Sequence, residues 1–228
     1  MKQTNPIQNN KQGYRIMINL YNQDCMEAMA SMKDNEFDLA IVDPPYGIGI
    51  DGQKESNCKN PKHNRKYFEH KGWDSKPPPK EYFEELFRVS KNQIIWGANY
   101  YPHYLFSSKG WIVWDKGQKG LTMSDCELAF SSFNRATRIF VCNRNALAQE
   151  GTIHPTQKPI KLYMWLLSKY AEKGWKILDT HLGSGSSAIA CDTLGYEFHG
   201  YELDEEYYLG AKKRLEQHQR QIKLPLGI

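Results

Sequence analysis

The sequence lacks any long hydrophobic run. No stretch of its 228 residues approaches the roughly 20 apolar residues that a membrane-spanning helix needs. The polar first residues also lack the apolar middle of a secretory signal, so we expect a cytoplasmic protein with no membrane partner. Because 40% of the residues are hydrophobic, the chain can still bury one sizeable core, which predicts a single domain.

Cysteine is scarce and scattered. The five cysteines are odd in number, and no two form a Cys-x-x-Cys pair, which argues against a disulfide framework and a standard zinc site. Cys58 lies near His63 and His70, but this spacing matches no common zinc pattern. We therefore expect reduced thiols and no metal.

The chain also has no large excess of charge of either sign. Its 30 basic and 26 acidic residues give a net charge of +4, which suits a polyanionic partner and is equally ordinary in enzymes without one. Basic residues gather in the polar segment 51–79, which glycine and proline interrupt, and we interpret it as a mobile basic insertion. It either contacts the phosphates of a polyanionic partner or is a plain solvated loop. Residues 1–12 predict a disordered tail, which leaves 13–228 as the domain.

Strands alternate with helices along the rest of the chain. Short runs of strand-forming residues lie at 37–42, 94–96, 111–114, 128–130, 139–142, 175–178 and 197–201. Helical periodicity is present at 81–89, 160–171, 186–194 and 205–217. This order predicts an α/β fold with a doubly wound, mostly parallel sheet.

A glycine-rich turn between a strand and a helix gives the clearest ligand signal. After the strand ending at Asp179, Gly183 and Gly185 precede a helix, and glycines let a ligand approach the backbone closely. The next strand ends at Glu202, about 20 residues further on, where nucleoside-binding α/β folds place a carboxylate for ribose hydroxyls. The pattern predicts a site for the adenosine half of a cofactor.

The same glycines also fit a dinucleotide fingerprint, so NAD is an alternative cofactor. Only one helix follows Glu202, however, so the remaining strands of the sheet must come from before the glycine turn. That order is permuted relative to an ordinary NAD-binding domain.

A second motif, Asp43-Pro44-Pro45-Tyr46, follows directly on a buried strand. This position places the aspartate at the carboxyl edge of the sheet, where α/β folds bind ligands. An exocyclic amino group of a base needs two acceptors for its N–H bonds before its lone pair can react, and Asp43 and the Pro44 carbonyl can be those acceptors. Tyr46 supplies a stacking face worth roughly 1–3 kcal/mol, which offsets much of the cost of rotating a base out of the duplex.

These motifs resemble those of the DNA amino-methyltransferases, in the permuted order called the β class, over nearly the whole chain. The resemblance includes residues 20–29 with Asp24, and the segment 154–159, His-Pro-Thr-Gln-Lys-Pro. It implies a Rossmann-like methyltransferase fold, S-adenosyl-L-methionine as cofactor, double-stranded DNA as partner and a plausible homodimer. An aspartate opening the tetrapeptide is more usual among the adenine enzymes, which makes adenine N6 the favoured target.

The resemblance also implies the site residues. The catalytic residues are Asp43, Pro44, Pro45 and Tyr46. The cofactor-binding residues are Asp24, Cys25, Asp43, His154, Thr156, Lys158, Asp179, His181, Gly183, Ser184, Gly185, Ser186, Glu202 and Leu203.

Several alternatives stay open at this point. The same tetrapeptide chemistry serves cytosine N4, RNA bases or a glutamine side-chain amide in proteins. A nucleotide- or DNA-binding protein that has lost catalysis, and an NAD oxidoreductase, are alternatives from other classes. A cytosine C5 methyltransferase is excluded, because none of the cysteines follows a proline as that family's nucleophile does.

Overall fold

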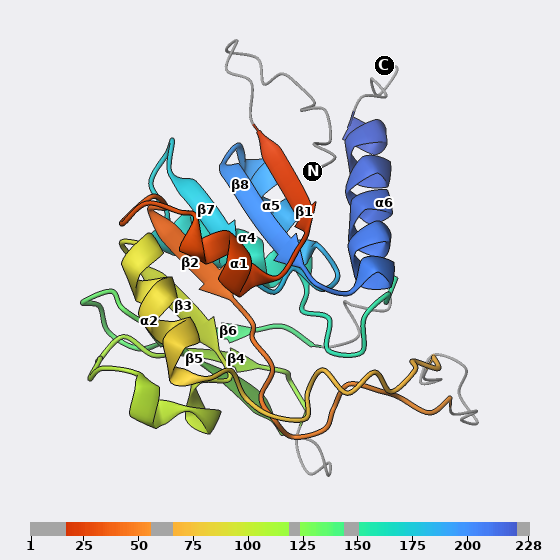
Figure 1. Ribbon diagram of the computed structural model, residues 1–228, viewed down its shortest axis with the longest axis horizontal. Coiled ribbons are helices and arrows are strands. Elements are labelled where there is room, and N and C mark those ends of the chain that lie inside the picture. The colour runs from red at the N-terminus through yellow and green to blue at the C-terminus, as the bar shows by residue number, and fades with distance from the viewer. Residues whose placement is uncertain (1–16, 56–65, 119–123, 144–150, 223–228) are drawn as a thin grey trace.

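One eight-stranded sheet forms the centre of the protein. A computed structural model describes residues 17–55, 66–118, 124–143 and 151–222 (Figure 1). The strands are β1 (Ile18–Asn22), β2 (Leu39–Val42), β3 (Gln93–Trp96), β4 (Ile112–Asp115), β5 (Cys126–Ser131), β6 (Arg138–Val141), β7 (Lys176–Asp179) and β8 (Glu197–Glu202). Their order is β1-β8-β7-β2-β3-β5-β4-β6, with the first five parallel and β5 antiparallel to β3 and β4.

Helices cover both faces of this sheet. The helices are α1 (Cys25–Ala30), α2 (Lys80–Val89), α4 (Ile160–Tyr170), α5 (Ser186–Leu194) and α6 (Glu205–Ile222), with short 3-10 turns η2 (Ala98–Tyr100) and η3 (Pro102–Tyr104). In Figure 1, α1 and α2 lie in front of the sheet and α4 and α5 lie behind it. None of the described helices is long and apolar enough to cross a membrane.

Strand β2 shows why the sheet is buried on both faces. Its four residues are almost inaccessible, and successive side chains of a strand point to opposite faces. Leu39 and Ile41 join the core with α4 and α5, whereas Ala40 and Val42 join the core with α1 and α2. Such a continuous apolar run is typical of a parallel strand between two helical layers.

The predicted doubly wound α/β fold is confirmed. Every strand and helix predicted from the sequence is present, with ends that differ by a few residues. Strand β1 and helix α1 were not predicted from the sequence. For β1, the polar residues Asn19 and Asn22 break up its short apolar pattern.

The insertion at 51–79 is held at both described ends, although its middle and the 1–12 tail lie outside the described residues. Asp74 is buried and accepts backbone N–H groups from Gly47 at 2.8 Å and Ile50 at 2.9 Å. Gln53 and Phe68 exchange two backbone hydrogen bonds at 2.8 and 3.0 Å, so the two sides run together away from the body (Figure 1). These described flanks are therefore anchored, where the sequence reading predicted mobility. The division into a tail and a single domain stays a prediction.

The direction of winding changes between β2 and β7. From β7 the chain continues outward through β8, and from β2 it continues to β3 on the other side. At such a switch point the connecting loops diverge and leave a crevice outside the carboxyl ends of the strands. Asp43 follows β2 and Asp179 ends β7, so the two predicted motifs meet at this crevice.

Candidate active site

Two cavities lie at the switch point and share a wall. The smaller, of about 530 Å³, is lined by all four residues predicted to be catalytic. The larger, of about 720 Å³, lies against the glycine turn and the end of β8. Both sizes are typical of ligand sites. The shared wall consists of Asp43, Pro45, Trp73, Thr156, Gln157 and Lys158.

Both carboxylate oxygens of Asp43 accept a hydrogen bond from a neighbouring side chain. The Tyr46 hydroxyl donates to Oδ1 at 2.7 Å, and the Lys158 ammonium donates to Oδ2. Each oxygen keeps lone-pair capacity, because a carboxylate can accept about four hydrogen bonds. The carboxylate is therefore fixed in direction and still able to accept N–H groups from a ligand.

Tyr46 is fitted closely against its neighbours. Its ring stacks on Tyr100 with a centroid separation of 5.0 Å and an interplanar angle of 18°. Gly97 has φ +69°, and a Cβ there would lie 2.1 Å from Cε1 of Tyr46. Glycine is required at position 97 both for this backbone conformation and for this contact.

Glu127 and Lys116 complete a chain of alternating charges that the sequence reading missed. Lys158 Nζ lies 3.0 Å from one Glu127 oxygen, and Lys116 Nζ lies 2.8 Å from the other. The Tyr46 hydroxyl is also 3.4 Å from Glu127. The available sequence signals were a carboxylate within the mostly apolar strand β5 and a lysine directly after β4.

The environment shifts the ionisation of this cluster. Burial raises the pKa of Asp43, and Glu127 adds to this shift while Lys158 opposes it. Burial alone would lower the pKa of Lys158, but the two carboxylates outweigh it and the pKa is raised. Burial alone would raise the pKa of Glu127, but Lys158 and Lys116 outweigh it and lower this pKa to about 2. Lys158 and Glu127 are therefore both charged at neutral pH.

The glycine turn beside the larger cavity is held by two carboxylates. Asp179 accepts the His181 backbone N–H at 3.0 Å and the Ser187 hydroxyl at 2.6 Å. Glu202 accepts the backbone N–H groups of Gly183 at 2.8 Å and Asp204 at 3.0 Å. Burial raises the pKa of Asp179 to about 7 and also raises that of Glu202.

The cavity walls add a capped helix and two neutral histidines. Asp24 Oδ1 caps α1, accepting N–H groups from Met26 at 2.7 Å and Glu27 at 3.2 Å. Burial lowers the pKa of His154 to about 3 and that of His181 to about 4. Both imidazoles are therefore uncharged at neutral pH.

Most of the residues predicted to bind the cofactor come together at the larger cavity. Its lining includes Asp24, Cys25, Asp43, His154, Thr156, Lys158, His181, Gly183, Ser184, Glu202 and Leu203. Three predicted residues, Asp179, Gly185 and Ser186, do not line it.

The reason is local packing. A Cβ at Gly185 would lie 3.0 Å from Cβ of Ala211 on α6, so this glycine permits close helix packing. The Ser186 hydroxyl accepts from Arg214 on α6 at 2.8 Å. Asp179 is buried behind the turn and supports its backbone.

Residues of the insertion form one side of the larger cavity, which was not predicted from the sequence. Lys71 binds Asp204 and Glu206 at 2.8 Å each. The Trp73 ring lies 5.3 Å from that of His154, which in turn lies 4.3 Å from Tyr207. These contacts join the insertion to α6 across the cavity.

The described residues contain no group of three or more side chains suited to hold a metal. Cys58 and His63 lie outside them, and His70 pairs with the buried Asp51 at 2.8 Å.

Comparisons with known proteins agree with this geometry. Residues 108–213 match a family model described as DNA methylase. The type II methyltransferase M.HpaI of Haemophilus parainfluenzae is 25% identical over 244 residues, covering 85% of this chain and 72% of its own. The crystal structure of the M1.HpyAVI–SAM complex has a TM-score of 0.57 at 21% identity, covering 86% of this chain and 98% of that one. PvuII DNA methyltransferase, described as cytosine-N4-specific, has a TM-score of 0.58 at 12% identity, covering 89% and 90%.

The structural likenesses show the fold, and they confirm the predicted Rossmann-like methyltransferase architecture. The match of residues 108–213 to the DNA methylase model and the similarity to M.HpaI support an amino-methyltransferase of the class that modifies N6 of adenine or N4 of cytosine, which is the class that the family resemblance indicated.

Proposed function

We propose that the protein methylates N6 of adenine in double-stranded DNA, with S-adenosylmethionine as the methyl donor. The observation that carries this proposal is the position of Asp43, whose carboxylate stands in the wall between the two cavities. A methyl transfer between two bound molecules needs such a meeting point, because the reacting atoms must lie within about 3–3.5 Å.

The residues of the larger cavity fit this cofactor. Glu202 ends β8 at the cavity, where nucleoside-binding folds place the acceptor for ribose hydroxyls. A Cβ at Gly183 would meet nothing nearer than the His154 ring, at 3.8 Å, so the turn leaves its backbone open to a ligand. When bound, the cofactor supplies an electrophilic methyl group, and the reaction yields S-adenosylhomocysteine, a methylamino group and a proton.

The smaller cavity fits a base rotated out of the duplex. Asp43 and the Pro44 carbonyl are the acceptors for the two amino N–H bonds, and Asp43 is the nearest base for the released proton. Tyr46 is positioned by Tyr100 and Gly97, so its ring is a rigid stacking surface. Hydrogen bonds from the Tyr46 hydroxyl and Lys158 orient the Asp43 carboxylate. Its remaining lone pairs accept an N–H group of the target base.

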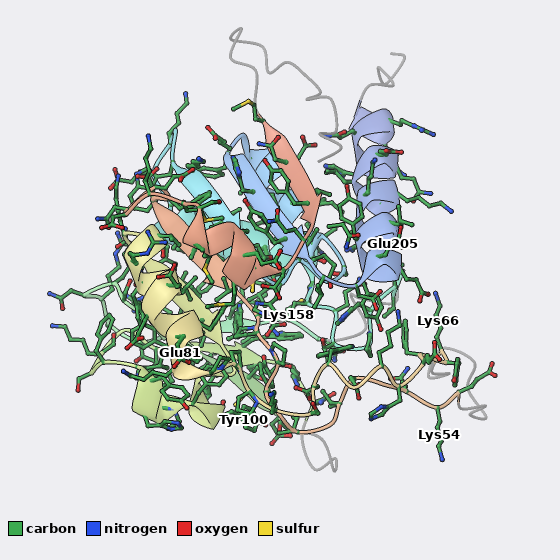
Figure 2. The ribbon with its side chains drawn as sticks, viewed as in Figure 1. Lys54, Lys66, Glu81, Tyr100, Lys158 and Glu205 are labelled. Carbon is green, nitrogen blue, oxygen red and sulfur yellow. The ribbon has the colours of Figure 1, made fainter. Side chains whose placement is uncertain are left out.

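Duplex DNA is supported by the location of the insertion. Ile48 and Ile50 line the smaller cavity, and the chain continues from them into the insertion. Lys54 lies on its outer side in Figure 2, and Lys76 is also exposed. Phosphate contacts there would hold the duplex during base extrusion. A homodimer stays a prediction from the family resemblance.

The test is a product analysis. The purified protein is incubated with unmethylated duplex DNA and methyl-labelled S-adenosylmethionine, and the DNA is digested to nucleosides for mass spectrometry. Label in N6-methyladenine is the expected result. Label in N4-methylcytosine would keep the mechanism and replace the base, whereas unlabelled DNA would contradict the proposal.

A further inference from the structure

Lys158 is an unusual residue for the wall between two cavities, because it is buried and charged. Its side chain is only 2% exposed, and lysine is almost never fully buried unless it is paired. Figure 2 shows it in the interior, whereas Lys54 stands at the outer edge of the insertion. Such a cation persists only if its donors and its charge are satisfied.

Both conditions are met at this position. The ammonium group has three donors, and three acceptors surround it: Asp43 Oδ2, Glu127 Oε2 at 3.0 Å and the Tyr46 hydroxyl at 3.1 Å. Lys116 balances the second carboxylate from the far side, at 2.8 Å. The sequence of charges is Asp43, Lys158, Glu127, Lys116, alternating in sign.

We propose that Lys158, clamped by Glu127, is a positioning residue that keeps the Asp43 carboxylate ionised and directed at the amino group of the target base. This inference rests on the proposed function. A protonated Asp43 would lose part of its acceptor capacity and could not take up the proton that methylation releases. Without a cation beside it, a buried carboxyl would hold its proton to a much higher pH.

Other titratable groups on several elements of the fold interact electrostatically with Asp43. They are Tyr46, Tyr82 on α2, Tyr101 after η2, Glu127 on β5, Tyr163 on α4 and Asp179 on β7. The tyrosines are neutral at neutral pH, because burial raises their pKa values further. Lys158 is thus the only cation beside Asp43 among these described residues, and Asp179 is a second carboxyl group, whose pKa burial raises to about 7.

The pH dependence of methyl transfer tests this inference. Initial rates on duplex DNA at saturating cofactor are measured from pH 5 to 9 for the wild type, Lys158→Met and Glu127→Gln. Removing the cation should move the acid limb of Lys158→Met to higher pH by at least about one unit, which is about a tenfold loss at any pH below the limb. Removing the second carboxylate should move the limb of Glu127→Gln to lower pH.

Two further variants make the result specific. Lys91→Met removes an exposed lysine that pairs with Asp38 at the other end of β2, and it should leave the limb in place. Asp179→Asn removes the second buried carboxyl group, whose pKa is raised to about 7, and an acid limb that persists in this variant is assigned to Asp43.

Each outcome decides the inference. If the transfer rate of Lys158→Met falls equally at every pH and the acid limb shifts in neither variant, Lys158 has only a structural role and the inference is overturned. A limb that disappears in Asp179→Asn would overturn it too. If Lys158→Met does not fold, the direction of the Glu127→Gln shift decides. A wild type that transfers no methyl group to DNA would instead refute the proposed function.

Discussion

The two cavities that meet at Asp43 are held by different kinds of interaction. The smaller is built on ion pairs among residues far apart in the chain, such as Asp43, Glu127 and Lys158. The larger is built on carboxylates that accept backbone N–H groups, with Glu202 holding Gly183, and on neutral histidines. Ion pairs thus dominate the smaller cavity, and local backbone geometry dominates the larger one.

This difference separates two tasks. Directing an amino group requires a fixed carboxylate, and an ion-pair chain fixes both its direction and its ionisation. Holding a nucleoside requires an open turn and acceptors for hydroxyls, which a glycine loop and a strand-end carboxylate supply. We therefore expect substitutions to affect transfer and cofactor affinity separately.

Among substitutions outside the catalytic motif, Gly97→Ala should have the largest effect and should act on the smaller cavity alone. Its Cβ would lie 2.1 Å from the Tyr46 ring, so the ring must leave its position. We expect transfer to fall by at least about 100-fold, which is about 2.7 kcal/mol or more, with cofactor affinity unchanged. The measurements are the transfer rate and cofactor titration calorimetry.

Gly174→Ala is the matched control for this substitution. Gly174 also has positive φ, +88°, but a Cβ there would meet nothing within 4 Å. It should cost only about 1–2 kcal/mol of stability and keep full transfer. Equal activity of the two variants would refute the packing role of Gly97.

Glu202→Gln should act on the larger cavity. The amide has one acceptor oxygen in place of two, so it cannot hold both Gly183 and Asp204 as well as a ribose. We expect the cofactor dissociation constant to rise about 10- to 100-fold, about 1.4–3 kcal/mol, with less change in the rate at saturation. Glu197→Gln, at the start of the same strand, should leave both values unchanged.

His181→Phe should alter how stability depends on pH. The pKa of His181 is lowered to about 4, so at pH 5 an unfolded chain is protonated there while the folded chain is not. The neutral His181 therefore contributes to the free energy of unfolding above the pKa that it has in the unfolded chain, and this contribution is lost as the pH falls below that value. The wild type should lose about 2 kcal/mol from this residue between pH 7 and pH 5, and the variant should not. Urea titrations at both pH values measure this, and an identical loss in the two proteins would contradict the assignment.

Lys71→Met should have the smallest effect. It removes a partly exposed ion pair with Asp204 and Glu206 that ties the insertion to α6. Such pairs contribute about 1 kcal/mol or less, so cofactor affinity should fall only a few-fold, and less at high salt. Lys80→Met, at an exposed pair with Glu84, should change nothing. A loss of 100-fold would show that the insertion matters far more than its contacts indicate.

The site features that could be predicted from the sequence are those that lie within short stretches of the chain. Gly183 and Glu202 follow strands within one short stretch of chain, so their spacing alone predicted the cofactor turn. Asp43 also follows its strand directly, and the family resemblance gave its role. These features are local, and local patterns are what a single sequence records most directly.

The missed residues depend on how distant segments pair. Glu127 reaches the site because β5 lies antiparallel beside β3, which no local pattern indicates. Trp73 reaches the larger cavity because its segment folds back and is anchored by the buried Asp74. Gly185 and Ser186 lie outside the lining of the larger cavity for the same reason, since only the position of α6 shows that Gly185 packs against Ala211 and that Ser186 accepts from Arg214.

The most direct test of two separable half-sites joined at Asp43 is one preparation of Asp43→Ala assayed for both properties. Cofactor affinity is measured by calorimetry, and methyl transfer to duplex DNA by label incorporation. We predict that transfer falls by at least about 1,000-fold, since the group that directs the amine is lost, while the dissociation constant for the cofactor stays within a few-fold of the wild type. An active Asp43→Ala enzyme, or one that loses cofactor binding together with transfer, would contradict this account.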